Sequence, residues 1–202
     1  MNFITSYCQL DDNQFSVNGE QLLENDSTSS WMRTLYDYLK LDYPKFHKMD
    51  LMSKVGTIGI EILKERNEKI VQYADDEIAL IFANRNSSAN TDMKFQKSYK
   101  EKEAPSPSLF VYTLPNILMG EIAIKNKWYG ENIFTVSEEF DADFFENYCN
   151  ILIPDKAKAC VCGWINVLDN KIDAFLFTVE KAVKSHDNLI LTPNNLLNLR
   201  KA

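Results

Sequence analysis

The chain has few cysteines. Four occur among its 202 residues: Cys8, Cys149, Cys160 and Cys162. They are too few and too scattered for a disulfide scaffold, and we expect them to be reduced. The pair Cys160 and Cys162 could suggest a metal site, but zinc sites space their thiols by two or more residues and need a second pair of ligands. On a strand these two side chains share one face, which favours a role as small buried hydrophobes.

The chain also lacks an excess of basic residues and a long apolar run. Its 22 Lys and Arg are outnumbered by 29 Asp and Glu, which gives a net charge of −7. Nucleic acid and anionic membranes need a basic surface, so neither is an expected partner. No apolar run reaches the ~18–20 residues that span a bilayer, and the N-terminus lacks the regions of a signal peptide. We therefore expect a cytoplasmic protein.

Hydrophobic sequence is abundant. Hydrophobic residues make up 45% of the chain and aromatic residues 12%, enough to bury the core of one domain covering residues 1–202. Residues 11–30 are rich in turn formers and predict a loop. Strands are predicted at 3–10, 78–83, 132–136, 157–163 and 171–180, and helices at 31–40, 45–63, 114–127, 141–152 and 194–199. This order predicts a layered α/β domain, with helices on both faces of a mixed sheet.

The predicted helix from Leu114 to Lys127 is the best candidate for the central helix. Pro115 suits the first turn of a helix, where its missing N–H is harmless, and Gly130 is expected to close the element. We predict that this helix is the most buried one in the fold. Gly120 would then allow close approach of a strand or a second helix.

The most specific pattern runs from Ser106 to Ser137. It consists of Ser106-Pro107, several apolar residues, Thr113-x-x-Asn116, Gly120 in an amphipathic helix, Gly130 and a strand. The pattern resembles the stretch of β-ketoacyl synthases, a family of thiolase-like condensing enzymes, that leads to the nucleophilic cysteine. Weaker similarities are Lys48-Met49-Asp50 before the first long helix and Gly163 at the end of a later strand, where the family has Gly-Gly. The resemblance implies the N-terminal half of a thiolase-like fold.

The chemistry of that family does not follow from this sequence. An ungapped alignment places the nucleophile at Glu139, and one inserted residue places it at Phe140. No cysteine occurs between Cys8 and Cys149. The resemblance does not reach the family's C-terminal half, which supplies two histidines or a histidine and an asparagine. The resemblance therefore implies a ketoacyl-synthase-like subunit without the condensing nucleophile, with no cofactor and no metal.

Two other interpretations stay open at this stage. An altered site using Glu139, Asn116 or Cys149 could serve an acyltransferase or a malonyl decarboxylase, or the likeness could extend to the fold alone. Glu138 and Glu139 could also simply cap the following helix, where acids complement the helix dipole.

The resemblance also implies partners. Members of the family pair as dimers through the strand before the nucleophile, here Asn132, Ile133, Phe134, Thr135 and Val136. We expect a homodimer, or a heterodimer with a ketoacyl synthase, because a half-length chain lacks the second half that covers its sheet. An acyl carrier protein is a further possible partner, in fatty-acid-like or polyketide-like biosynthesis.

Overall fold

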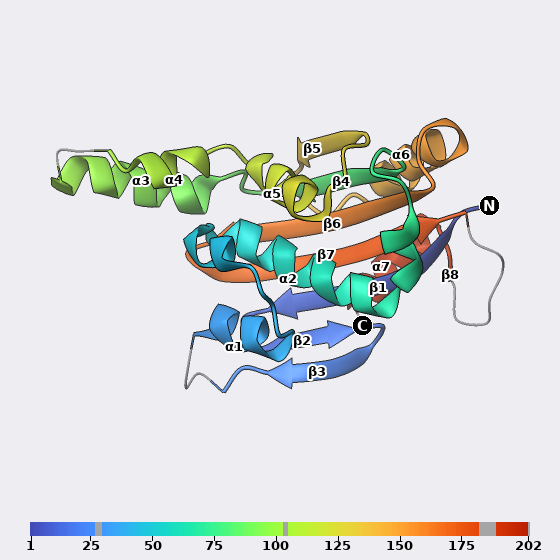
Figure 1. The fold of residues 1–202 in the computed structure, drawn as a ribbon, viewed down its shortest axis with the longest axis horizontal. Coiled ribbons are helices and arrows are strands. Elements are labelled where there is room, and N and C mark those ends of the chain that lie inside the picture. Colours follow the sequence, from blue (N-terminus) through green and yellow to red (C-terminus); the bar gives the residue numbers. More distant parts are fainter. Residues whose placement is uncertain (27–29, 103–104, 182–188, 202) are drawn as a thin grey trace.

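The strands form one mixed sheet. The computed structural model describes residues 1–26, 30–102, 105–181 and 189–201. In this part of the chain the strand order is β3-β2-β1-β7-β6-β4-β5, with β8 paired to β1 outside that path (Figure 1). β4 runs parallel to β5 and β6, and the other pairs are antiparallel. The strands are β1 (Phe3–Asp11), β2 (Gln14–Val17), β3 (Glu20–Glu24), β4 (Ile78–Asn84), β5 (Asn132–Val136), β6 (Ala159–Leu168), β7 (Lys171–Glu180) and β8 (Leu189–Ile190).

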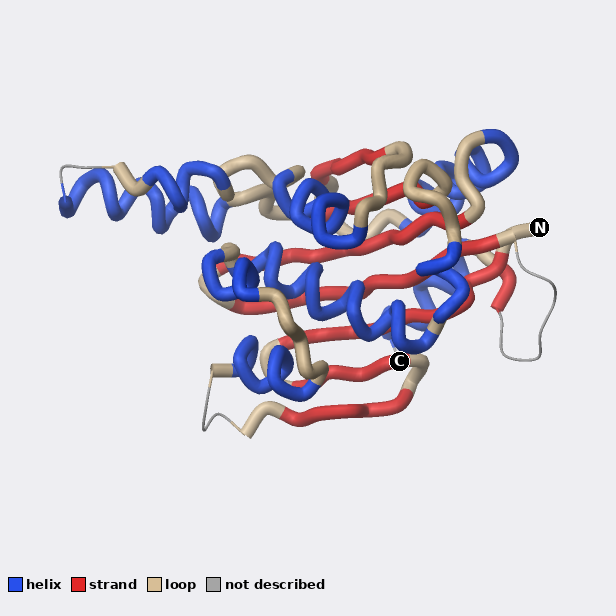
Figure 2. The backbone as a smooth tube through the Cα atoms, viewed as in Figure 1, coloured by secondary structure: helices blue, strands red, loops and turns tan. Residues whose placement is uncertain are grey.

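Helices lie on both faces of this sheet (Figure 2), which confirms the predicted layered α/β architecture. The first face carries α1 (Trp31–Tyr38), α2 (Leu51–Arg66) and α5 (Ile117–Asn126), and the second carries α6 (Ala142–Asp155) and α7 (Pro193–Lys201). Short 3-10 helices, η1 (Pro44–Lys48) and η2 (Glu68–Gln72), flank α2. No helix within the described ranges is long and apolar enough to cross a membrane.

β4 lies at the centre of both cores. Every residue of this strand is buried, as its continuous apolar run predicts for a strand covered on two faces. Leu80 and Phe82 pack in the first-face cluster with α2, whereas Ala79 and Ile81 pack in the second-face cluster with α6. Alternation of side chains along one strand therefore supplies both cores.

The central helix is α2, and the prediction that assigned this role to the segment 114–127 is wrong. Ten of the 16 residues of α2 are buried, against four of ten in α5. A Cβ at Gly59 would lie 2.7 Å from the side chain of Leu176, and one at Gly56 would collide with Leu118, whereas one at Gly120 would meet nothing within 4 Å. The close approach predicted at Gly120 occurs instead at the two glycines of α2, and α5 packs beside that helix with Leu118 and Ile122 against Gly56.

Residues 11–30 also differ from the prediction, since they include a β-hairpin. Strands β2 and β3 are joined by Asn18 and Gly19, whose φ angles of 49° and 81° are positive. This is the dihedral pattern of a tight hairpin turn, for which Asn-Gly is the preferred sequence. Phe15 and Val17 of β2 are buried in the first-face core.

The second face is better covered than a half-length chain predicts. Leu196 of α7 is fully buried and packs with Phe175 and Phe177 of β7 in the second-face cluster. This helix extends beyond the segment 194–199 predicted for it. Ile151 of α6 stays 64% exposed, so some apolar surface is left on this side.

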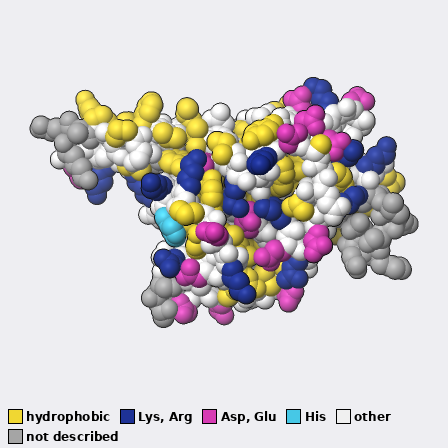
Figure 3. All heavy atoms as spheres, viewed as in Figure 1, with side chains coloured by type: hydrophobic (Ala, Val, Ile, Leu, Met, Phe, Trp, Pro, Cys, Tyr) yellow, Lys and Arg dark blue, Asp and Glu magenta, His cyan; other side chains and the backbone are white. Residues whose placement is uncertain are grey.

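An arm projects from one end of the sheet (Figure 1). It consists of α3 (Ala89–Lys102) and α4 (Pro107–Val111). Figure 3 shows apolar side chains gathered along it, among which Met93, Tyr99 and Phe110 are 46–61% exposed.

Candidate functional site

β5 is an edge strand of the sheet. Among the described residues it pairs with β4 alone. The backbone N–H of Leu80 donates to the Glu131 carbonyl at 2.9 Å, and that of Ser137 donates to the Asn84 carbonyl at 3.0 Å. Because alternate residues of a strand direct their N–H and C=O groups to the same side, residues 131, 133, 135 and 137 face β4. The backbone groups of Asn132, Phe134 and Val136 therefore point outward, away from the sheet.

The side chains of β5 do not guard this edge. Phe134 packs partly on the first-face core and Ile133 partly on the second, while Val136 is 52% exposed. The strand contains no proline and no charged residue, which are the usual barriers to pairing with another chain. The strand has its predicted bounds, Asn132–Val136, and lies at an edge of the sheet; its role as a dimer contact stays a prediction.

Gly130 brings the chain into β5. A Cβ at this position would collide with the carbonyl oxygens of Ile78 and Asp76, so the close passage of this segment along the start of β4 requires glycine. The sequence predicts that Gly130 closes α5, and this prediction is wrong. That helix ends at Asn126, and Lys127 adopts the left-handed conformation that terminates it, with φ 58°.

The turn after β5 holds both candidate nucleophile positions. The Ser137 hydroxyl donates to the Glu139 carbonyl at 2.9 Å, the Glu139 side chain is exposed, and Phe140 is 8% exposed. α6 begins at Ala142 and its N-cap is Asp141, whose carboxylate accepts from the Phe144 N–H at 2.9 Å. The interpretation that Glu138 and Glu139 cap this helix is therefore wrong, because both precede the cap.

Phe140 lies beneath a guanidinium group from α7. The Arg200 guanidinium carbon is 5.1 Å from the ring centre of Phe140 and 5.5 Å from that of Trp164. Arg200 Nη2 donates to both carboxylate oxygens of Asp173 at 2.8 and 3.0 Å, and Trp164 Nε1 donates to the same carboxylate at 3.0 Å. Cation–π attraction and paired charges thus hold the end of α7 over the turn.

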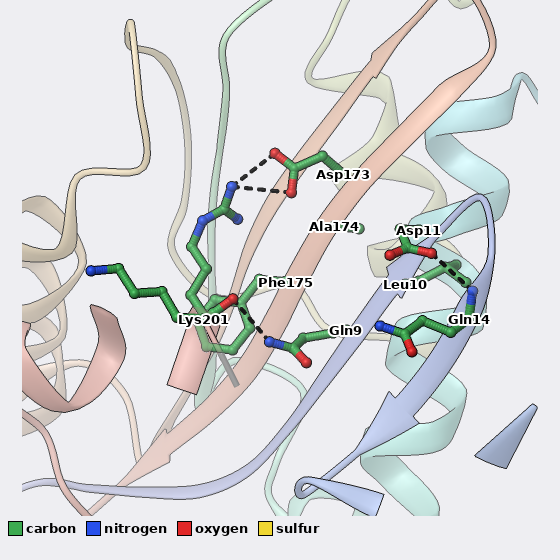
Figure 4. A pocket seen from close by; sticks show the side chains of 9 residues that line it. Gln9, Leu10, Asp11, Gln14, Asp173, Ala174, Phe175 and Lys201 are labelled. Atoms are coloured by element: carbon green, nitrogen blue, oxygen red, sulfur yellow. Dashed lines mark hydrogen bonds and ion pairs between the residues drawn. The ribbon is translucent and has the colours of Figure 1, made fainter. Parts of the chain in front are cut away.

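A pocket of about 380 Å³ opens beside this group. Its lining includes Arg85, Glu138, Glu139, Asn166, Arg200 and Lys201, and no cysteine or histidine. A second pocket of about 170 Å³ shares Asp173, Arg200 and Lys201 with it (Figure 4). There Gln9 Nε2 donates to the backbone carbonyls of Leu199 and Arg200, which ties α7 to β1. The place of the expected nucleophile thus offers carboxylates and cations, and no thiol or imidazole.

The cysteines lie in the cores. Cys149 of α6 has its Sγ atom 3.5 Å from that of Cys162 on β6, and both side chains are fully buried. Burial raises the pKa of both thiols, so neither forms a reactive thiolate readily. The predicted role as small buried hydrophobes is confirmed, and Cys149 is inaccessible as a nucleophile. No group of three His, Cys, Asp or Glu in the described segments is arranged to hold a metal ion.

The other motif residues, Thr113, Asn116 and Gly163, take part in structural contacts. The Thr113 carbonyl accepts from Ser88 Oγ at 2.7 Å, and Asn116 precedes α5 without a side-chain cap bond. Neither lines the pocket of the turn. Gly163 on β6 leaves room for the ring of Phe82, which a Cβ would strike. These residues shape the scaffold around β4, β6 and α5.

Sequence reasoning missed Trp164, Asp173 and Arg200 as neighbours of the turn. They come from β6, β7 and α7, and no local pattern marks their convergence. His47 is exposed in η1, and His186 lies outside the described residues.

Comparison with family models and with curated proteins gives no match. Among solved structures, the chain is similar to the AntDE:AntF complex of a type II PKS acyl-carrier protein with its ketosynthase, at 10% identity and a TM-score of 0.66. It is also similar to the ishigamide ketosynthase/chain length factor, at 13% identity and 0.63. A third is the ketosynthase ApeO in complex with its chain length factor ApeC from Xenorhabdus doucetiae, at 14% and 0.54.

The likeness covers most of this chain and part of the others. The alignments include 89%, 92% and 80% of it, and 62%, 63% and 73% of the respective matched chains. At these identities the likeness establishes the fold, which is the thiolase-like, ketosynthase type that the segment from Ser106 to Ser137 predicts.

Proposed function

We propose that this chain is a ketoacyl-synthase-like subunit without a condensing nucleophile, and that it pairs with a cysteine-containing ketosynthase in polyketide-like or fatty-acid-like biosynthesis. The observation that carries the proposal is the β5 edge, where Asn132, Phe134 and Val136 leave outward backbone groups unpaired in the described structure. A partner strand would satisfy these groups and cover the exposed side chain of Val136.

The turn after β5 supports the non-catalytic part of the proposal. A condensing reaction needs a thiolate to carry the acyl chain and donors to stabilise the oxyanion. Glu139 presents a surface carboxylate at one candidate position, and Phe140 is packed under Arg200 at the other. The protein would act by completing or shaping the site of its partner, and intact-mass measurement after incubation with acyl- and malonyl-thioesters should find no covalent adduct.

The similar structures support the type of partner. Two of them contain a ketosynthase together with a chain length factor, and the other contains an acyl-carrier protein bound to its ketosynthase. By analogy, we infer a ketosynthase as the direct partner of this chain. Carrier proteins are acidic and this chain carries −7, so we assign carrier docking chiefly to the ketosynthase.

The test is copurification with a cysteine-containing ketosynthase of the same organism, measured by light scattering after size-exclusion chromatography. Val136→Pro removes an outward N–H without removing a bond to β4, and proline is tolerated on strand edges. We expect it to weaken the complex at least tenfold while the unfolding temperature stays near that of the wild type. Val136→Ala is the matched control, because it shortens the side chain and keeps the N–H. An undiminished complex in Val136→Pro would contradict the proposal.

A further inference from the structure

Acidic side chains stand at both ends of the β5 edge. After the strand, Glu138 and Glu139 are exposed, and Asp141 and Asp143 follow at the start of α6, also exposed. Arg85, Arg200 and Lys201 also line the pocket of Glu138 and Glu139, and Arg200 is paired with Asp173. Two cations thus remain against these four carboxylates. The charge at this end of the strand is therefore negative.

The other end of β5 is also acidic. Glu131 immediately precedes the strand, and Asp76 lies beside it in a shallow surface pocket that Lys156 also lines. Lys156 forms an ion pair with Glu131, and about half of each of these two side chains is exposed. Asp76 is exposed and is left as the excess charge of this pocket.

Pairing of β5 with a second copy would bring these two ends together. A two-fold axis makes the strands antiparallel, so the start of one strand meets the end of the other. In the register of full overlap, with Phe134 on the axis, Glu131 lies opposite Ser137 and diagonal to Glu139 of the copy, since diagonal neighbours on one face are two residues apart. A shift of two residues, the smallest that keeps the outward-facing residues paired, places Glu131 directly opposite Glu139. The symmetry repeats this contact, so the like charges meet twice.

We propose that these flanking acids prevent β5 from pairing with itself and select a different chain whose edge strand is flanked by Lys or Arg. The inference rests on the proposed pairing through β5 and adds the chemistry of the partner. Like charges that face one another across paired strands destabilise the pair, whereas opposite charges stabilise it. A basic-flanked strand would meet Glu131 at one end and Glu138 with Glu139 at the other.

The experiment measures self-association by sedimentation and light scattering at low salt. In Glu138→Lys/Glu139→Lys, each copy offers lysines to Glu131 of the other, so this variant should dimerise at least tenfold more tightly than the wild type. An equal mixture of variant and wild type should have intermediate affinity, because one end attracts and the other repels. The difference should shrink in 1 M salt, where the Debye length falls to about 3 Å.

The matched control is Glu20→Lys/Glu24→Lys on β3, which makes the same change in net charge at the opposite edge. It should leave the chain as monomeric as the wild type. The inference is overturned if the wild type already dimerises as tightly as the lysine variant, or if the β3 variant dimerises equally well. Adding Val136→Pro to the lysine variant should dissolve its dimer, which shows that the contact is at β5.

The two proposals can fail separately. If the lysine variant stays monomeric while the wild type binds a ketosynthase in a Val136-dependent manner, the charge inference fails and the proposed function stands. If the lysine variant dimerises through β5 and no ketosynthase binds, the edge is an association surface with the inferred selectivity and the proposed partner is wrong.

Discussion

The two edges of the sheet end in strands of the same length with opposite chemistry. β3 (Glu20–Glu24) begins and ends with an exposed glutamate, and its central leucines lean onto the first-face core. β5 (Asn132–Val136) has no charge between its ends and leaves Val136 exposed. Both present unpaired backbone groups, so the difference lies in the side chains. β3 carries charges within the strand, as natural edge strands do to prevent pairing. β5 has acids only beyond its ends, where we propose that they disfavour a second copy and favour a basic-flanked strand.

The largest expected effect comes from placing a charge within β5, which would remove its difference from β3. Phe134→Lys places an ammonium group at the centre of the edge and removes a ring that packs on the first-face core. We expect loss of the complex with a ketosynthase, together with destabilisation of about 1–3 kcal/mol from the lost packing. Gln21→Lys on β3 is the control and should change neither. Binding is measured by light scattering and stability by urea unfolding. Retention of the complex in a folded Phe134→Lys variant would remove β5 from the interface.

A second, smaller effect on stability is expected at the ion pairs that link α2 to α5, the helix that precedes β5 in the chain. Glu61 on α2 accepts from Lys125 Nζ of α5 at 2.7 Å and from Lys64 Nζ at 2.9 Å. Burial alone raises the pKa of the Glu61 carboxyl, but the two ammonium groups outweigh it and the pKa is lowered overall. A lowered folded-state pKa stabilises the fold above the unfolded value of about 4.3, and this contribution is lost as the pH falls through the folded pKa.

The measurement is the free energy of unfolding in urea between pH 7 and pH 3. Glu61→Gln should cost about 1–3 kcal/mol at pH 7, because it leaves two largely buried ammonium groups without their carboxylate. The difference between the variant and the wild type should narrow below about pH 4. Amide exchange should rise in α5 and β5 more than in β2 and β3. A difference that is constant over the whole pH range would show that the ion pairs do not stabilise α5.

The sequence predicts best the elements whose own pattern decides their state. β5 and β7 have their predicted bounds, and the buried run of β4 lies at the centre of both cores as expected. The hairpin of β2 and β3 could also have been predicted, because Asn18-Gly19 is a strong turn signal. It follows a segment in which Phe15 and Val17 alternate with polar residues. The choice of central helix could not, since α2 and α5 both have apolar faces and only tertiary contacts at Gly56 and Gly59 decide between them.

The candidate site shows the same limit. The strand from Asn132 to Val136 and the lack of a cysteine just after it can be found from the sequence, because each involves residues that are neighbours along the chain. The group of Phe140, Trp164, Asp173 and Arg200 is not, since its members are brought together by the order β7-β6-β4 and by the position of α7 over the second face. The acidic residues that flank β5 lie between these cases, because the sequence contains them but their proposed role depends on the unpaired edge that the structure shows.

The smallest expected effect is in the two cores, where the four buried cysteines should not react with thiol reagents. Burial raises the pKa of Cys8, Cys149 and Cys162. A hydrogen bond with Cys149, together with burial, raises the pKa of Cys160, and none of these side chains is exposed. Iodoacetamide at pH 7.5 should therefore label no cysteine in the native protein within an hour and all four in denaturant, as counted by intact mass. Phe140→Ala should leave Cys8 protected and, by loosening the contact between α6 and β6, allow slow labelling of Cys149. Rapid labelling of a single cysteine in the wild type, or its acylation by an acyl-thioester, would identify a reactive thiol and contradict the proposal of a subunit without a nucleophile.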